Sequence, residues 1–144
     1  MMVAEMRYIL AVLALIGVLV SAKTIQVHYS TAVEACNINA VWDCGIVNHS
    51  PFAEVAGLPV AEIGIAGYLV LALLALLRRR GLLFAALLPA LGFALYLTHI
   101  EKDILQVWCL YCVISQGLIA LLTLLSLGWL VSEELAKLRE KKHS

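Results

Sequence analysis

Charged side chains are scarce in this chain of 144 residues, and this scarcity limits the classes of protein to which it can belong. Only 14% of the residues are charged, and ten basic and ten acidic side chains give a formal net charge of +0. That balance provides no basic surface for nucleic acid. No glycine-rich G-x-G-x-x-G stretch follows a strand, so a nucleotide-binding domain is not expected. With no internal repeat and no low-complexity tail, residues 1–144 are predicted to form one domain.

Apolar residues dominate what is there. Hydrophobic types make up 63% of the chain, and the mean hydropathy is +0.97. A helix needs about 20 apolar residues to cross the hydrocarbon of a bilayer. Four apolar runs approach that length, at about 8–27, 60–78, 82–99 and 104–131. The sequence therefore predicts an all-α integral membrane protein, a four-transmembrane-helix bundle.

The basic residues give this bundle an orientation. Along a four-helix path eight of the ten fall on one side, namely Arg7, Arg78, Arg79, Arg80, Lys137, Arg139, Lys141 and Lys142. Only Lys23 and Lys102 fall on the other. Because positive residues stay on the cytoplasmic side, both termini are predicted to be cytoplasmic in a multi-pass protein of the cell membrane. The loop 28–59 and the short turn "THIEKD" between the third and fourth helices are then extracytoplasmic.

The N-terminal run has an alternative interpretation. Arg7, a short apolar core and "VSA" before Lys23 resemble a signal peptide with a small-residue cleavage site. Cleavage there would leave three spans and would break the even topology that the basic residues favour.

The chain has only four cysteines, and all are predicted at the outer face. Cys36 and Cys44 lie in the outer loop, and Cys109 and Cys112 lie near the outer end of the fourth helix. Disulfides form and persist on that side of the membrane. Cys109 and Cys112 are three residues apart, so within a helix they would share a face, and a nearby helix N-terminus would favour a thiolate. This Cys-x-x-Cys pattern is typical of redox-active thiols.

Other interpretations of the cysteines remain. Two structural disulfides could staple a non-catalytic membrane subunit. Structural zinc sites have two short-spaced pairs, and the spacing from Cys36 to Cys44 is longer than that. A c-type haem would need histidine where Val113 stands. A b-type haem between His28 and His99 is an alternative, although single histidines near helix ends are more often interfacial.

The outer loop is too long for a plain connection, and short helices are predicted in it. "TAVE" at 31–34 has the spacing of a capping box. Farther on, Ser50 is placed as an N-cap with Pro51 at the first helical position and Gly57 as the stop. The apolar face of this second helix, which carries Phe52, would lie on the membrane as a lid over the bundle. The alternative is a solvated surface helix.

The electron acceptor of such a site must be a strong oxidant that dissolves in the membrane. Oxidising dithiol carriers lie near about −120 mV and structural disulfides below about −300 mV. That gap of ~180 mV corresponds to roughly 8 kcal/mol for two electrons. A quinone meets both demands, and its pocket is predicted among the outer halves of the helices with Cys112 in the wall.

The order of the cysteines and their neighbouring residues along the chain points to a protein family. Cys36, Cys44 and Ser50, followed by "GLPVAEIGIAGY" and "WCLYC", resemble the vitamin K epoxide reductase family in its prokaryotic branch. The resemblance covers nearly the whole chain. It implies a four-helix bundle that reduces a quinone of the ubiquinone, menaquinone or vitamin K type while oxidising thiols.

The resemblance also implies roles for the cysteines. Cys36 and Cys44 would be the shuttle pair, Cys109 would accept electrons from the shuttle, and Cys112 would act on the quinone. Electrons would come from a thioredoxin-like (DsbA-like) protein, in which disulfides are generated. Many prokaryotic members carry that domain fused. This chain ends at Ser144 without one, so a separate extracytoplasmic partner is expected.

The quinone contacts follow the family less closely. Ser50 matches the family serine near the site. Animal members have a quinone-contacting tyrosine four residues after the last cysteine, and here that position is Gln116. Phe52 and Glu62 are further candidates, the latter because it lies near the outer end of the second helix. Another bacterial quinone-linked disulfide generator also has four helices and two cysteine pairs, but its Cys-x-x-Cys comes first in the chain.

Overall fold

The structure is a computed structural model that describes residues 2–29, 41–43, 46–47, 49–51, 54–55 and 57–143. Four long helices make up most of it: α1 (Met2–Tyr29), α3 (Val60–Leu76), α4 (Arg80–His99) and α5 (Leu110–His143). A π-helical segment, η2 (Ile100–Leu105), continues α4, and strands β1 (Glu54–Val55) and β2 (Leu58–Pro59) precede α3. The predicted fold class, an all-α bundle of four helices with a lid segment between the first two, is confirmed.

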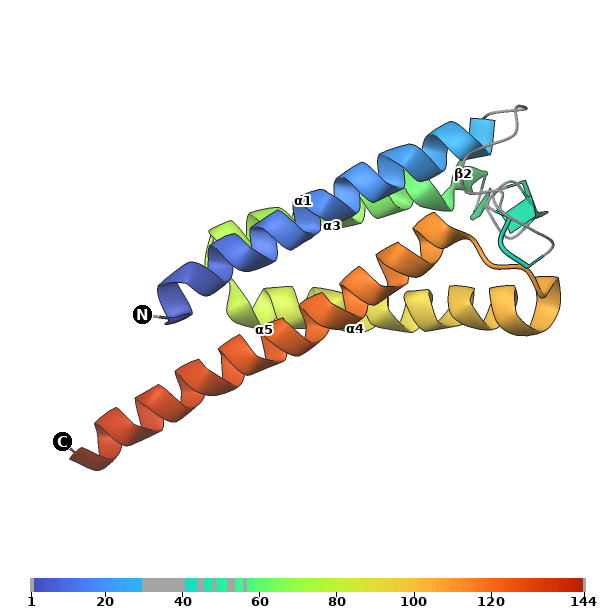
Figure 1. Ribbon diagram of the computed structural model, residues 1–144. Coiled ribbons are helices and arrows are strands. Elements are labelled where there is room, and N and C mark those ends of the chain that lie inside the picture. Colours follow the sequence, from blue (N-terminus) through green and yellow to red (C-terminus); the bar gives the residue numbers. More distant parts are fainter. Residues whose placement is uncertain are drawn as a thin grey trace.

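The helices pack as an elongated bundle with two distinct ends (Figure 1). α1 runs beside α3, and α5 packs against both α1 and α4. The two termini and the turn between α3 and α4 lie at one end, which we call the terminal end. The strands, η2 and the beginning of α5 lie at the other, which we call the site end.

The outer surface of the bundle is apolar. α1, α4 with η2, and α5 are long and apolar enough to cross a membrane, and α3 is a shorter apolar helix of 17 residues. Leu19 and Leu124 on the outer surface are each 68% exposed in the isolated chain. Large leucines are rarely left in contact with water in such numbers, and lipid is the solvent that suits them.

Toward the terminal end the helices enclose a closely packed core. Leu10, Leu83, Leu87, Leu122 and Trp129 are each no more than 2% exposed there. At the middle of the bundle α1 approaches α3 closely at a glycine. A Cβ atom on Gly17 would lie within 2.3 Å of the Tyr68 ring, so only glycine fits. Small residues at helix–helix contacts are common in membrane bundles, and here Gly17 makes room for an aromatic ring of the neighbouring helix.

One predicted turn is wrong. The segment "THIEKD" (98–103) is helical, because α4 runs to His99 and η2 continues to Leu105. The ion pair from His99 Nδ1 to Asp103 Oδ2, at 2.8 Å and four residues apart, supports a helical path. The chain leaves the helix at Gln106, which has a left-handed backbone with φ of 56°. The non-helical link to α5 is therefore 106–109.

The predicted helix after Ser50 is also corrected. Residues 54–55 are a strand, not helix, and pair antiparallel with 58–59 in the register Glu54 to Pro59 and Val55 to Leu58. Gly57 has φ of 84° and makes the tight turn that only glycine adopts without strain. A segment this short gains little from helix formation, because nucleation costs several ordered residues. Residues 46–47 are helical, and the capping box at 31–34 lies outside the described residues.

Candidate active site

A cavity of about 370 Å³ lies in the half of the bundle nearer the site end. Apolar side chains, mainly of α3 and α4, make most of its wall, and α1 contributes Ser21 and Thr24. Eight polar or sulfur-bearing side chains also reach it: Ser21, Thr24, Ser50, Tyr68, Glu101, Cys112, Ser115 and Gln116. A mostly apolar hollow with a few convergent polar groups is typical of small-molecule sites, which measure about 300–1,000 Å³. The cavity suits a flat, largely apolar ligand with a few polar atoms.

The Cys-x-x-Cys pair stands where α5 begins. Cys109 precedes the first residue of α5, and its backbone oxygen accepts a hydrogen bond from the Val113 amide at 2.9 Å. Its Sγ accepts another from the Cys112 amide at 3.3 Å. Cys109 therefore caps the helix instead of lying inside it, which corrects the placement predicted from spacing alone. The unpaired amides of a helix N-terminus attract negative charge, so this position favours a thiolate on Cys109.

The two cysteines differ in what surrounds them. Cys109 is 0% exposed and packs with Val27 of α1 and Val47 of the segment between α1 and α3. Cys112 is half-buried and lines the cavity. A ligand in the cavity would meet Cys112, whereas Cys109 is closed off from solvent by the side chains packed around it.

A pair of tryptophans joins the segment 41–43 to the chain just before Cys109. Trp42 and Trp108 form an isolated parallel β-bridge, with ring centroids 6.3 Å apart. The Asp43 amide donates to the Trp108 oxygen at 2.9 Å, and the Trp108 amide donates to the Val41 oxygen at 2.6 Å. In the sequence Cys44 follows Asp43, as Cys109 follows Trp108. The bridge fixes the register of the loop against the link 106–109.

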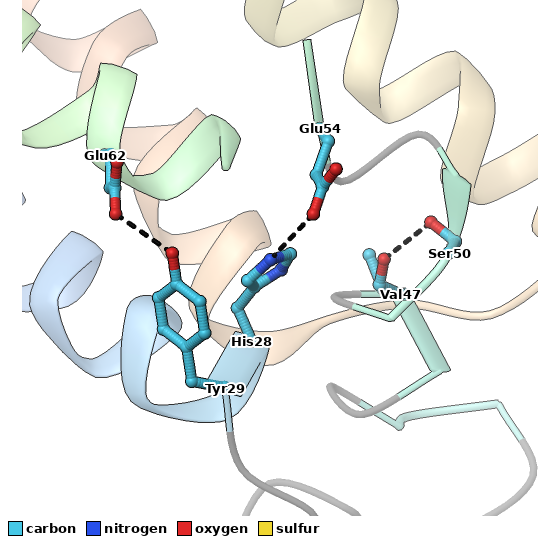
Figure 2. Close-up of polar contacts among 6 residues, drawn as sticks. All are labelled: His28, Tyr29, Val47, Ser50, Glu54 and Glu62. Atoms are coloured by element: carbon cyan, nitrogen blue, oxygen red, sulfur yellow. Dashed lines mark hydrogen bonds and ion pairs between the residues drawn. The ribbon is translucent and has the colours of Figure 1, made fainter. Parts of the chain in front are cut away.

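Ser50 closes a local turn in the segment between α1 and α3 and lines the cavity. Its hydroxyl donates to the backbone oxygen of Val47 at 2.7 Å, as Figure 2 shows. Ser50 also lines the cavity, while Val47 covers Cys109. This one side chain thereby links the lid over the buried thiol to the wall of the cavity.

Two further contacts fasten this end of the molecule together (Figure 2). His28 Nε2 lies 3.3 Å from Glu54 Oε1, which connects α1 to the hairpin. The Tyr29 hydroxyl donates to Glu62 at 3.2 Å, which connects α1 to α3. Glu62 is thus engaged at the rim of the bundle.

A buried polar chain crosses the cavity wall beside Cys112. The Thr98 hydroxyl lies 2.8 Å from Gln116 Oε1, and Gln116 Nε2 donates to Glu101 Oε1 at 3.3 Å. Glu101 is only 2% exposed, and its Oε2 finds no hydrogen-bond partner within the part of the chain that the structure describes. The thiols of Cys109 and Cys112 both belong to the electrostatic surroundings of this carboxyl group. A buried carboxyl with an unmatched oxygen is costly, so its place at the cysteines is informative.

A second polar contact lies deeper in the cavity. Tyr68, 3% exposed on α3, donates its hydroxyl hydrogen to Ser115 of α5, whose backbone oxygen is 2.9 Å away and whose hydroxyl is 2.7 Å away. Both residues line the cavity. The pair fixes α3 against α5 and offers a ligand hydroxyl groups in an otherwise apolar wall.

The structure brings together part of the set predicted from sequence. Cys112, Ser50 and Gln116 share the cavity wall, with Cys109 directly behind it. Cys36, Cys44 and Phe52 lie outside the described residues. Glu62 is not among the residues that line the cavity, and its role remains a prediction.

Sequence reasoning missed five polar residues of the wall, of which Glu101 and Tyr68 bear most on the chemistry; the others are Ser21, Thr24 and Ser115. Glu101 was assigned to an exposed turn, and a helical path through 98–105 is what buries it. An acid eight residues before the first cysteine of Cys-x-x-Cys was the available signal. For Tyr68 the signal was a single hydroxyl within a strongly apolar helix, where polar groups tend to have a purpose.

The arrangement can support thiol–disulfide chemistry coupled to an apolar electron acceptor. One sulfur stands at a helix N-terminus beneath a loop, and its partner faces a cavity. A model of the vitamin K epoxide reductase family matches residues 8–127, which include all four cysteines and every cavity residue named above. The match covers 120 of the 144 residues, and it agrees with the four helices and the resemblance carried by the cysteine pattern. The chain belongs to the vitamin K epoxide reductase family.

Proposed function

We propose that the chain transfers electrons from a thioredoxin-like protein to a membrane quinone, leaving the thioredoxin-like protein with a new disulfide. Membership of the family supports a multi-pass, quinone-coupled thiol oxidoreductase in general terms. The observation that carries the specific proposal is the position of Cys112. It lies in the wall of an apolar cavity, with its partner Cys109 buried on the side of the loop. This division suits one sulfur for the quinone and one for the electron donor.

The cavity suits a quinone head group. Apolar walls would receive the ring and the beginning of its isoprenoid tail. Ser50, Tyr68 and Gln116 would offer polar atoms to the two ring oxygens. Phe52 and Glu62 stay candidates for further contacts. Ubiquinone, menaquinone and vitamin K share this ring chemistry, and the cavity is proposed to take a quinone of this class.

The relay between the cysteine pairs has a geometric basis. Cys109 is fully buried, so a soluble protein cannot attack it directly. The tryptophan bridge pairs Trp42 with Trp108, and the two segments run parallel. Cys44 follows Trp42 by two residues and Cys109 follows Trp108 by one, whereas Cys36 is six residues from Trp42. This shorter separation favours Cys44 as the thiol that attacks Cys109, with Cys36 left for the partner.

The steps balance as thiol–disulfide exchange. The partner dithiol reduces the Cys36–Cys44 disulfide and becomes oxidised. The Cys44 thiolate attacks Cys109 in the Cys109–Cys112 disulfide and expels the Cys112 thiolate. Cys36 then attacks Cys44, which releases Cys109 and restores the loop disulfide. The reduced Cys109–Cys112 pair passes two electrons and two protons to the quinone, which leaves as quinol.

The compartment of this chemistry is proposed from charge. Eight of the ten basic residues belong to the terminal end, which is predicted to be cytoplasmic. The site end, with its cysteines, would then face the extracytoplasmic side of the cell membrane. A reporter fused after Ser144 should be active in the cytoplasm, and one inserted near Asn48 should be active outside. The reverse result would place the thiol partner in the cytoplasm and overturn the assignment.

Quinone reduction by the purified protein tests the function. We expect the wild-type chain in detergent, given a short-chain ubiquinone and dithiothreitol, to bleach the quinone absorbance catalytically. Cys112→Ser should reduce the rate to background, and an exposed-site variant such as Ser132→Ala should leave it unchanged. Turnover by Cys112→Ser near the wild-type rate would favour the alternative, a non-catalytic subunit held by two structural disulfides.

A further inference from the structure

The buried carboxyl group of Glu101 has no function in the relay described above. A carboxylate at 2% exposure loses most of its hydration, and interiors keep such groups only with partners or a purpose. The Gln116 amide donates to its Oε1, and its Oε2 has no well-formed hydrogen bond among the described residues, while the Cys109 backbone and the Cys112 thiol also lie close enough to interact with the carboxyl group. It lines the same cavity as Cys112. A buried carboxyl group that lines a cavity beside a thiol is a candidate for handling protons.

The hydrogen bonds around Glu101 accommodate both of its protonation states. Thr98 has one hydroxyl hydrogen and two acceptors at 2.8 Å, the Ala94 carbonyl and Gln116 Oε1. When Thr98 donates to Gln116, the amide turns its Nε2 toward Glu101, which matches an ionised carboxylate.

The opposite arrangement needs only a flip of one amide. When Thr98 donates to Ala94, its oxygen can accept a hydrogen bond from Gln116 Nε2. The amide then presents its oxygen to Glu101, which matches a protonated carboxyl group. The Glu101 carboxyl group can thus gain or lose one proton while the buried donors and acceptors of the Gln116 amide stay hydrogen-bonded.

The reaction at this place needs such a group. Oxidation of two thiols by a quinone moves two electrons and two protons, and the proton of Cys112 must leave within a cavity whose walls are mostly apolar. A carboxyl group adjacent to both the thiol and the ligand space shortens the path of that proton.

We propose that Glu101 is the proton carrier between Cys112 and the quinone, an inference that rests on the proposed function. Glu101 as carboxylate takes the proton of the Cys112 thiol as the Cys109–Cys112 disulfide forms. It then gives that proton to a quinone oxygen and returns to the carboxylate. The Cys109 proton leaves to water, and the second proton of the quinol comes from water. Two thiols and one quinone become one disulfide and one quinol.

The titratable groups that bear on Glu101 are few. Within the described residues the two cysteines of the pair are the ones in its electrostatic surroundings. Its neighbours in η2, Lys102 and Asp103, are exposed, and Asp103 is paired with His99 on the outside of the helix. Asp103 therefore provides a matched control, an acid on the same element that points away from the cavity.

The test compares Glu101→Gln, Glu101→Asp and Asp103→Asn in the full-length protein, with short-chain ubiquinone and dithiothreitol across a range of pH. Glutamine keeps the size and polar contacts of the side chain and removes the exchangeable proton. We expect Glu101→Gln to lower kcat by about a hundredfold with little change in KM, since positioned acid–base groups contribute about 10²–10⁴-fold. Glu101→Asp should recover part of the rate and the wild-type shape of the pH profile. Asp103→Asn should behave as wild type.

The outcomes separate this inference from the proposed function. An unchanged rate and pH profile in Glu101→Gln, with Cys112→Ser inactive, would remove the proton carrier and leave the oxidoreductase intact. A loss of the same factor at every pH in both Glu101 variants would show a structural role and also overturn the inference. Absence of quinone reduction by the wild-type chain would overturn both proposals.

Discussion

The same apolar helices form both ends of the bundle, yet the terminal end is closely packed and the site end contains a cavity. Large side chains such as Leu87, Leu122 and Trp129 fill the interior toward the terminal end. Toward the site end the same helices present Ser21, Thr24 and other short side chains, and a cavity remains. The difference shows how a four-helix membrane protein separates stability from chemistry: close packing in one half holds the frame around an opening in the other.

The largest effect is expected from removing Cys112, the cysteine that lines the cavity. Cys112→Ala should abolish quinone reduction, because Cys109 alone cannot form the disulfide. It should also let a mixed disulfide accumulate, because the Cys109 thiolate can attack Cys44 in the loop disulfide and expel Cys36, and without Cys112 the crosslink can be resolved only by the reverse attack of Cys36. Mass spectrometry without reduction should find a Cys44–Cys109 crosslink. A Cys36–Cys109 crosslink would reverse the roles of the loop cysteines, and no crosslink at all would end the relay.

The second prediction separates the loop from the cavity. Cys36→Ser should block oxidation of a protein dithiol, because the partner would have no disulfide to attack. Dithiothreitol, which is small, should still reduce the Cys109–Cys112 pair and sustain quinone reduction. Rates measured with a reduced thioredoxin-like protein and with dithiothreitol should therefore differ widely in this variant. Equal oxidation of the protein substrate by Cys36→Ser and wild type would refute the shuttle.

The third prediction compares the same substitution, alanine to leucine, in the closely packed half of the bundle and in the half that contains the cavity. Ala75 is 0% exposed in the packed core, and Ala94 is 7% exposed in the cavity wall. Leucine at 75 has no space to occupy, so Ala75→Leu should destabilise the bundle by about 1–3 kcal/mol. Ala94→Leu should change stability by less, because the cavity receives the added atoms, and should raise KM for the quinone. Thermal unfolding and quinone kinetics on both variants check this, and equal destabilisation would mean that the cavity offers no room.

The smallest change in stability is expected from a substitution at the terminal end of the bundle. Arg80 Nη1 lies 3.6 Å from Glu133 Oε2, and its guanidinium lies 5.7 Å from the Trp129 ring centroid. Glu133→Gln removes the ion pair and keeps the contact with tryptophan. We expect a loss of about 0.2–1 kcal/mol, as for other partly exposed pairs, and unchanged quinone reduction. A defect in turnover without loss of stability would show that the two halves are coupled.

Sequence patterns were sufficient where hydrophobic length decides structure and insufficient where local turns do. The four helices follow from apolar runs that each approach the thickness of a bilayer. The position of Cys112 near the start of the last helix was also predictable from the run that follows it. The helical path of 98–105 was not, because "THIEKD" is polar and polarity alone resembles a loop. Packing in the folded bundle, which buries Glu101, outweighed the polar pattern of this segment.

The cavity itself was predicted only as a location. Its polar residues come from α1, α3, η2, α5 and the lid, and their convergence depends on how the helices are rotated against one another. Apolar runs without a polar stripe carry little information on rotation. The strand at 54–55 was missed for a different reason, since Ser50, Pro51 and Gly57 fit a capped helix as well as they fit a turn and a hairpin.

The tryptophan bridge also sets a kinetic hierarchy. Two backbone hydrogen bonds hold 41–43 beside Trp108, so in the proposed relay the exchange between the loop and Cys109 would be intramolecular and independent of protein concentration. A short tether of this kind gives an effective concentration on the order of millimolar. Collision with the proposed soluble donor, at much lower concentration, would then limit electron entry, and electrons would leave the loop faster than new ones arrive. Such a protein would stand mostly oxidised between encounters, ready for the next dithiol.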